Sequence, residues 1–225
     1  MPLETLKIGL CGGGPKTTKA ILPLVPSLRV LELSGMSLNR SSAATLAEAL
    51  QSASSLEQLS LSLGVSHIGK VLNAIKNSPI RTLILRHTKL GDTATKAVAA
   101  LMETSNSLKN LVMNDANLSR SRLETILRAL SKSKDSDPIR LDVSNNNLGS
   151  SLPSAFKFLD EGETLPQIQG LFVGKNNVSG ATLTAFCNVL PKLTSLRFLS
   201  LDGPLHWSST LTRTSDGARL GNALA

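Results

Sequence analysis

Apolar residues recur along the chain in short groups in which apolar and polar positions alternate. In the stretch 141–148, LDVSNNNL, the alternation runs into three asparagines before the next leucine. A similar string, LFVGKNNV, returns at 171–178. Alternation predicts a β-strand with one buried face, and the polar residues after it predict a turn. The similarity of the two strings indicates an internal repeat.

The pattern L-x-x-L-x-L, with other residues at some leucine positions, occurs eight times in near-constant register. The matches start at positions 3, 28, 56, 80, 108, 138, 168 and 196, so successive starts lie 24 to 30 residues apart. A single match would mean little because leucine is common. Eight matches in register predict an array of eight similar units.

The segments between the predicted strands carry a second period. Apolar residues recur four positions apart, as in Leu46 and Leu50 of the second unit and Phe186 and Leu190 of the seventh. Residues with this spacing share one face of an α-helix. The segments SSAATLAEALQ and SRLETILRAL begin with serine and are rich in good helix formers. Each unit is therefore predicted to contain a strand, a turn, a helix and a return loop.

On these repeats, the chain resembles the leucine-rich repeat family in its ribonuclease-inhibitor-like subtype. The resemblance covers essentially the whole chain. It implies an α/β solenoid, or horseshoe, of about eight repeats, with parallel strands on the concave face and helices on the convex face. We expect one domain over residues 1–225, whose last repeat, 205–225, is incomplete. Neither end supplies a clear cap, so we expect a truncated array or self-association through the uncapped ends.

The segment LDVSNNNLGSSLPSAFKFL, followed by LFVGKNN, also resembles repeats of the CARMIL family, the linker between actin capping protein and myosin I. This second resemblance implies a non-enzymatic protein-interaction scaffold in the regulation of the actin cytoskeleton. Two alternatives stay open, because other proteins carry similar arrays. One is a GTPase-activating or GTPase-regulating protein, as in the family that acts on the GTPase Ran. The other is an immune-sensor or inhibitor-type array.

The residues between the leucines form the predicted binding face. Strand alternation points the leucines inward and the intervening residues toward solvent on the concave side. Ile84 and Val112 are expected side by side, and Phe172 and Phe198 diagonally on the last two strands. An exposed apolar patch with polar neighbours is typical of a protein interface, although such residues also favour strands for packing alone. The candidate protein-binding residues are Ile84, Arg86, Val112, Asn114, Arg140, Asp142, Phe172, Phe198 and Asp202.

The asparagines have a structural explanation. Asn146 and Asn176 occupy the motif position whose side-chain amide is predicted to bond the backbone of neighbouring units, as in a ladder. Asn145 and Asn147 are predicted to be ordinary turn residues. The ladder is expected to be interrupted, because the same position in other units holds Cys11, Met36, Thr88 and Ala116. Three glycosylation sequons are interpreted as turn asparagines, and they begin at Asn39, Asn117 and Asn177.

Composition narrows the classes of partner. The net charge of +8, from 24 Lys and Arg against 16 Asp and Glu, predicts a weak attraction to anionic surfaces. The charges are scattered, and the 3% of aromatic residues argue against base stacking, so no specific nucleic acid is expected. No apolar run is long enough to span a membrane, and the first residues do not resemble a signal peptide. The two cysteines form no disulfide pattern, so a cytoplasmic location is expected.

No residue pattern predicts catalysis, a cofactor or a metal site. His67, His87 and His206 lie in different units, without Cys or Asp at metal-ligand spacing. The glycines of Gly12–Lys16 lack the spacing of a phosphate-binding loop. The acidic group Asp160–Glu163 falls in a loop without an apolar pocket that would shift its pKa values. A non-enzymatic protein is therefore expected.

Overall fold

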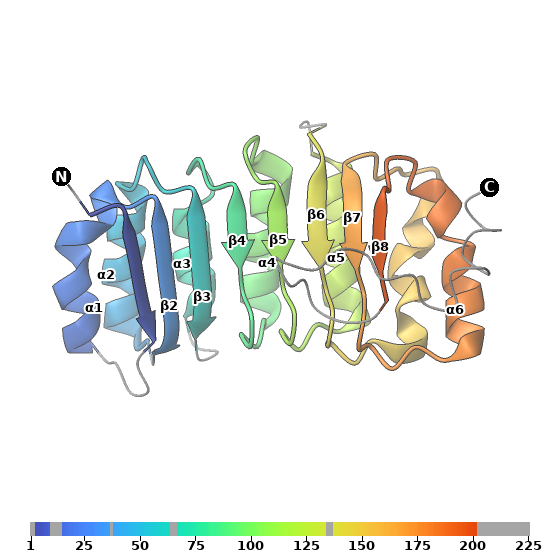
Figure 1. Cartoon of the computed structure of the whole chain (residues 1–225), viewed down its shortest axis with the longest axis horizontal. Helices are drawn as coiled ribbons and strands as arrows, with labels where there is room; N and C mark the ends of the chain where they lie inside the picture. The colour runs from blue at the N-terminus through green and yellow to red at the C-terminus, as the bar shows by residue number, and fades with distance from the viewer. Residues whose placement is uncertain (1–2, 10–14, 37, 64–66, 134–136, 202–225) are drawn as a thin grey trace.

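The computed structural model of the chain describes residues 3–9, 15–36, 38–63, 67–133 and 137–201. Within them, eight parallel strands form a single open sheet (Figure 1). The strands follow one another in the sheet in the order of the sequence. They are β1 (Thr5–Gly9), β2 (Val30–Met36), β3 (Gln58–Leu63), β4 (Thr82–Ile84), β5 (Asn110–Val112), β6 (Ile139–Asp142), β7 (Ile168–Phe172) and β8 (Phe198–Ser200). The predicted α/β class and the eight repeated strands are thereby confirmed.

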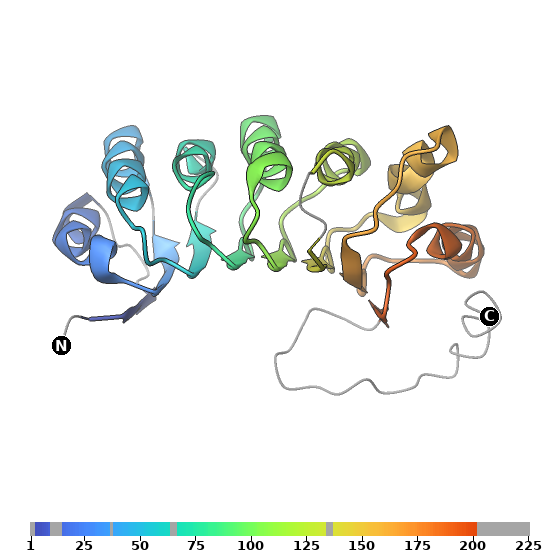
Figure 2. The same cartoon turned by 90° about the horizontal axis from the view of Figure 1, so that it is seen from above.

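Helical segments connect the strands and lie on one face of the sheet, so that the curved array has its strands on the inner side (Figure 2). The α-helices are α1 (Pro15–Ile21), α2 (Arg40–Gln51), α3 (Ile68–Ala74), α4 (Asp92–Thr104), α5 (Arg120–Ser131) and α6 (Gly180–Cys187). The 3-10 helices are η1 (Leu22–Ser27), η2 (Gly149–Ser151), η3 (Pro153–Glu161) and η4 (Leu190–Lys192). The predicted last repeat, 205–225, lies outside the described residues.

One column of leucines holds the two layers together. Parallel pairing aligns one leucine from every strand: Leu6, Leu31, Leu59, Leu83, Leu111, Leu141, Leu171 and Leu199. The six central members are at most 1% exposed, whereas the first and last are only partly buried. Full burial of a leucine side chain stabilises the fold by ~1.5–3 kcal/mol. Stacking of neighbouring units therefore builds the core that a single unit lacks.

The predicted helix faces and start signals are also present. Leu46 and Leu50 of α2 are fully buried, as are their counterparts on the other helices. Side chains cap three helices: Asn39 accepts the backbone N–H of Ser42 at 2.8 Å, and serines cap α5 and α6 in the same way. The sequon asparagine Asn39 is thus a helix cap rather than a turn residue. Capping satisfies backbone N–H groups that have no partner inside the helix.

The unit after β6 differs from the predicted α-helix. Its helix-side segment is the 3-10 helix η3, which starts at Pro153. Pro153 lacks a backbone N–H and cannot donate to an earlier carbonyl, so it begins a new helical segment after η2 instead of continuing one helix from Gly149. Phe156 and Phe158 of η3 are almost fully buried, and the Phe156 ring packs edge-on against Phe186 with centroids 5.8 Å apart. Aromatic side chains therefore fill this part of the core.

The asparagine ladder is confirmed at Asn146. Its side-chain Oδ1 accepts the backbone N–H groups of Ala116 at 2.9 Å and Leu118 at 3.0 Å, both in the preceding unit. Its Nδ2 donates to the carbonyls of Met113 and Val143, each at 2.9 Å. Asn146 therefore satisfies buried backbone groups of two units with one side chain.

Asn176 repeats this arrangement one unit later. Its Oδ1 accepts the backbone N–H groups of Asn146 at 2.9 Å and Leu148 at 3.3 Å. Thr88, at the same motif position in the fourth unit, reaches back with its hydroxyl and donates to the carbonyl of Leu61 at 2.8 Å. At this position the Thr88 hydroxyl thus makes a bond to the preceding unit in place of an asparagine amide. Cys11 lies outside the described residues.

The residues on either side of the ladder position make the turn. Asn145 and Asn147 have φ values of 57° and 55°, in the left-handed region that asparagine tolerates better than most residues. Positive φ values recur at the matching positions of other units, namely His87, Asp115, Asn117, Lys175 and Asn177. Asn177 also donates from Nδ2 to Oδ1 of Asn147 at 2.6 Å. The turn interpretation of the second and third sequons is confirmed.

Candidate functional site

No described helix or strand covers the face of the sheet opposite the helices, and we call this face the open face (Figures 1 and 2). Strand pairing aligns its central column as predicted: Lys7, Glu32, Ser60, Ile84, Val112, Asp142, Phe172 and Ser200. Outward-pointing residues of adjacent strands therefore form rows across eight strands. A partner that lies along the open face would meet these rows in succession.

Ile84 and Val112 are direct neighbours in the strand register, as predicted. They are only 7% and 1% exposed, however, so the expectation that they form an exposed apolar patch is wrong. Side chains on adjacent strands of a sheet lie close enough to cover one another, and β-branched residues of central strands fill this space well. These two residues stabilise the sheet instead of presenting an apolar anchor.

The polar neighbours of this pair are also less exposed than expected. Asn114 is buried, and Asp142 is fully buried, with its Oδ1 accepting the backbone N–H of Ser144 at 2.9 Å. The Oδ1 atom of Asn114 is buried and has no hydrogen-bond partner among the described residues. Arg86 is half-buried, and Asp202 lies outside the described residues. The polar residues expected beside Ile84 and Val112 are therefore mostly buried and not fully accessible to a partner.

The accessible part of the candidate set gathers at the last strands. Phe198 is 36% exposed, Arg140 is exposed and Phe172 is half-buried. The guanidinium carbon of Arg140 lies 5.6 Å from the centroid of the Phe198 ring, which is a cation–π distance. We call Arg140, Phe172 and Phe198 the arginine–aromatic patch. The structure brings these three predicted residues together.

Gly170 makes the patch possible, and sequence reasoning missed it as a functional residue. It pairs with Arg140 on one side and Phe198 on the other. A Cβ atom at Gly170 would lie 3.0 Å from Cγ of Arg140 and 3.4 Å from Cε2 of Phe172. The sequence signal that could have identified Gly170 is a glycine within a predicted strand, which often marks a position where another group approaches the backbone closely.

Charges divide the open face into two parts. Toward β1, opposite charges pair across neighbouring strands: Lys7 with Glu32 at 3.5 Å, and Arg29 with Glu57 at 2.8 Å. Hydrogen bonding to Glu57 raises the pKa of Arg29. These pairs compensate the charge of this part of the surface.

Toward β8, the described residues include three arginines that have no such ion pair. Lys109 pairs with Asp137, but none of the ion pairs within the described residues includes Arg81, Arg140 or Arg197. All three arginines are exposed, and Arg81 and Arg197 directly precede β4 and β8. Arg140 of the arginine–aromatic patch is therefore an exposed arginine without an ion pair among the described residues, and Arg81 and Arg197 add two more at strand starts.

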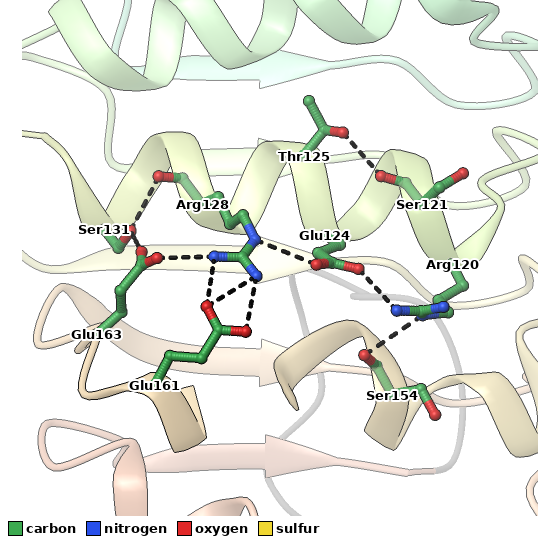
Figure 3. Close-up of polar contacts among 9 residues, drawn as sticks. All are labelled: Arg120, Ser121, Glu124, Thr125, Arg128, Ser131, Ser154, Glu161 and Glu163. Carbon is green, nitrogen blue, oxygen red and sulfur yellow. Dashed lines mark hydrogen bonds and ion pairs between the residues drawn. The ribbon is translucent and has the colours of Figure 1, made fainter. Parts of the chain in front are cut away.

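A second charged cluster lies on the helix side, between α5 and η3 (Figure 3). Arg128 bonds Glu124 at 3.1 Å, Glu163 at 2.7 Å and both carboxylate oxygens of Glu161. Its guanidinium also lies 4.8 Å from the centroid of the Phe158 ring. Hydrogen bonding to Glu161 raises the pKa of Arg128. Because three carboxylates hold its guanidinium, this arginine joins two units.

A shallow groove of about 870 Å³ lies where α2, α3 and α4 end. Polar uncharged side chains such as Gln51, Asn73 and Ser105 line most of it, together with Lys76. Its lining contains no carboxylate, imidazole or thiol. Hydroxyl and amide groups, with the single ammonium group of Lys76, are therefore the polar side-chain groups that line the groove.

The two histidines among the described residues, His67 and His87, belong to different units. His67 precedes α3, and His87 lies in a turn with its Nδ1 2.6 Å from Oδ2 of Asp115. His206 lies outside the described residues. Among the described residues, no three side chains of histidine, cysteine, aspartate or glutamate gather to hold a metal ion. In the same part of the chain, no helix has the length and apolar character needed to cross a bilayer.

No protein-family model matches the chain, and no curated protein matches it either. Its function must therefore be inferred from the repeat pattern and from the geometry of the surface.

Proposed function

We propose that the protein is a non-enzymatic protein-interaction module that binds its partner on the open face. The observation that carries this proposal is the arginine–aromatic patch. Phe198 keeps 36% of its surface exposed on a sheet face over which the described elements place no helix. Aromatic and arginine side chains contribute disproportionately to protein interfaces, because they bury much area and form directed polar contacts.

We also propose that the array belongs to the leucine-rich repeat class, in its ribonuclease-inhibitor-like subtype. Three features support the assignment: each motif match overlaps one of the eight strands, the leucines of the six central strands form a buried column, and Asn146 and Asn176 bond neighbouring units. A cytoplasmic location and a role in actin regulation are narrower proposals. The latter is supported by the resemblance of residues 141–177 to CARMIL repeats.

The proposal is tested by affinity capture with quantitative mass spectrometry. The full chain and two variants serve as baits: Phe198→Asp on the open face, and Ala181→Asp at an exposed position of α6. Both variants add one negative charge, but on opposite sides of the molecule. We expect Phe198→Asp to lose partners that Ala181→Asp retains. Equal recovery of every partner by both variants would show that binding does not use the open face. Actin-regulating proteins among the lost partners would support the narrower role.

A further inference from the structure

We infer that the partner presents a carboxylate-bearing segment with a neighbouring apolar side chain, which binds the arginine–aromatic patch. This inference rests on the proposed function and adds the chemistry of the partner. Its basis is the difference between the two parts of the open face. Near β1, Lys7 and Arg29 form ion pairs with carboxylates of the chain itself. Among the described residues, no carboxylate forms an ion pair with Arg81, Arg140 or Arg197.

Arg140 is already held in a binding-competent position. Its guanidinium lies 5.6 Å from the Phe198 ring centroid, so the aromatic face restricts the motion of the arginine while the side chain stays exposed. A planar guanidinium offers paired N–H donors that match the two oxygens of a carboxylate. Prior ordering of such a group lowers the entropy lost on binding. Arg140 is therefore the expected carboxylate contact.

The two phenylalanines indicate that the ligand is not merely an anion. Phe172 and Phe198 lie on adjacent strands, two positions apart in the register, and Phe198 pairs with Gly170. Because Gly170 has no side chain, it leaves space on the surface of the sheet next to the two rings. An aliphatic or aromatic residue of the partner would bury apolar area there.

A protein ligand fits these features better than a nucleic acid does. Single-stranded nucleic acids stack successive bases on several aromatic residues along a continuous basic groove. Here only Phe172 and Phe198 are available within the described strands, and ion pairs interrupt the basic character toward β1. The mixture of one ordered arginine with two half-exposed rings matches a short acidic and apolar peptide segment.

A random peptide library displayed on phage tests the inference when it is selected against the immobilised full chain. We expect the recovered peptides to be enriched in Asp and Glu next to large apolar residues. Fluorescence anisotropy with a labelled recovered peptide should give weaker binding as salt concentration rises. Arg140→Gln should weaken binding about tenfold, since it removes a charge-assisted contact. Arg120→Gln, an exposed change on the helix side, should leave it unaltered.

Three results would overturn the inference: no enriched peptides, enriched peptides without carboxylates, or tighter binding of labelled oligo-deoxythymidine than of any peptide. Unaltered affinity for Arg140→Gln would do the same. The proposed function fails separately. If peptides without carboxylates are recovered and Phe198→Asp abolishes their binding, the open face binds proteins but the assigned chemistry is wrong. If neither open-face variant affects binding, both proposals fail. Phe198→Leu, which keeps an apolar side chain, replaces the aspartate variant if that variant does not fold.

Discussion

The Arg140 guanidinium lies above the Phe198 ring, although these residues belong to strands β6 and β8 and the whole of β7 separates them. The intervening residue in the register is Gly170, and the Cγ atom of Arg140 passes 3.0 Å from the place where a Cβ would stand. The missing side chain of one strand thus lets a charged residue reach an aromatic ring two strands away. Among the candidate residues that the structure describes, this relationship joins an exposed arginine and an exposed aromatic ring in one patch.

Gly170→Ala should disturb the contact between Arg140 and Phe198. The new methyl group would press against Cγ of Arg140 and must move the arginine away from the ring. We expect the ring-current shifts of the Arg140 side-chain protons in NMR spectra to decrease, and the free energy of unfolding to fall by about 1 kcal/mol. Gly180→Ala is the matched control, because its Cβ would meet no atom within 4 Å. Unchanged Arg140 shifts in the Gly170 variant would contradict the assignment.

Asn146→Ala should destabilise the array strongly. The substitution leaves the buried N–H groups of Ala116 and Leu118 without their acceptor and also removes donors to two carbonyls. An unsatisfied buried group costs ~1–3 kcal/mol, so a total loss of about 3 kcal/mol is expected in urea denaturation. Asn145→Gly tests specificity, because glycine accepts the φ of 57° at that exposed turn position. A loss of similar size at both positions would argue against the ladder.

Asn39→Ala should weaken the start of α2. The Asn39 side chain accepts the backbone N–H of Ser42 at 2.8 Å and the Ser42 hydroxyl at 2.9 Å. Loss of an N-cap costs ~1 kcal/mol, which thermal denaturation should report as a lower melting temperature. Asn39→Asp keeps an acceptor oxygen at the cap and should retain most of the stability. If the alanine and aspartate variants melt alike, the cap contributes nothing.

Arg128→Gln should lower stability more than Arg120→Gln does. Arg128 bonds three carboxylates across two units, whereas the one carboxylate bonded to Arg120 within the described residues is Glu124. Hydrogen bonding to Glu161 raises the pKa of Arg128 in the folded state. A raised pKa stabilises the folded state at every pH below the unfolded-state pKa, and this contribution disappears only when the pH rises through the folded-state value.

The stability lost in Arg128→Gln should therefore be constant from about pH 6 to about pH 9, where the arginine and the carboxylates are all charged. Chemical denaturation of the wild type and the variant across this range measures the difference. A loss that shrinks steadily toward the alkaline end of the range would mean that another titrating group supplies the effect. Equal losses for the Arg128 and Arg120 variants would show that the contacts to Glu161 and Glu163 do not stabilise the fold.

The strands and the ladder could be predicted from the sequence because both depend on local pattern. Leucine spacing determines which side of a strand is buried, and the polar residue after each strand recurs at a fixed offset. The helix side was less predictable, since the segment after β6 forms the two 3-10 helices η2 and η3 where one α-helix was expected. Apolar side chains of this segment, among them Phe156, are nevertheless buried in the core.

The candidate site was less accessible to sequence reasoning, because exposure depends on neighbours that are distant in sequence. Alternation placed Val112 and Asp142 in the outward column correctly, but it could not show that both would be almost completely buried. The contact between Arg140 and Phe198 joins residues 58 positions apart, counted from their numbers, and depends on Gly170. No local pattern contains this information.

The central claim is that the open face binds a partner protein, and arginine-specific chemical labelling tests it most directly. The chain is labelled with and without the affinity-captured partner, and mass spectrometry compares Arg140 and Arg197 on the strand side with Arg120 on the helix side. The account predicts that the partner protects Arg140 and Arg197 while Arg120 reacts as before. Protection of Arg120 with unchanged labelling of Arg140 would place the partner on the helices and contradict the account.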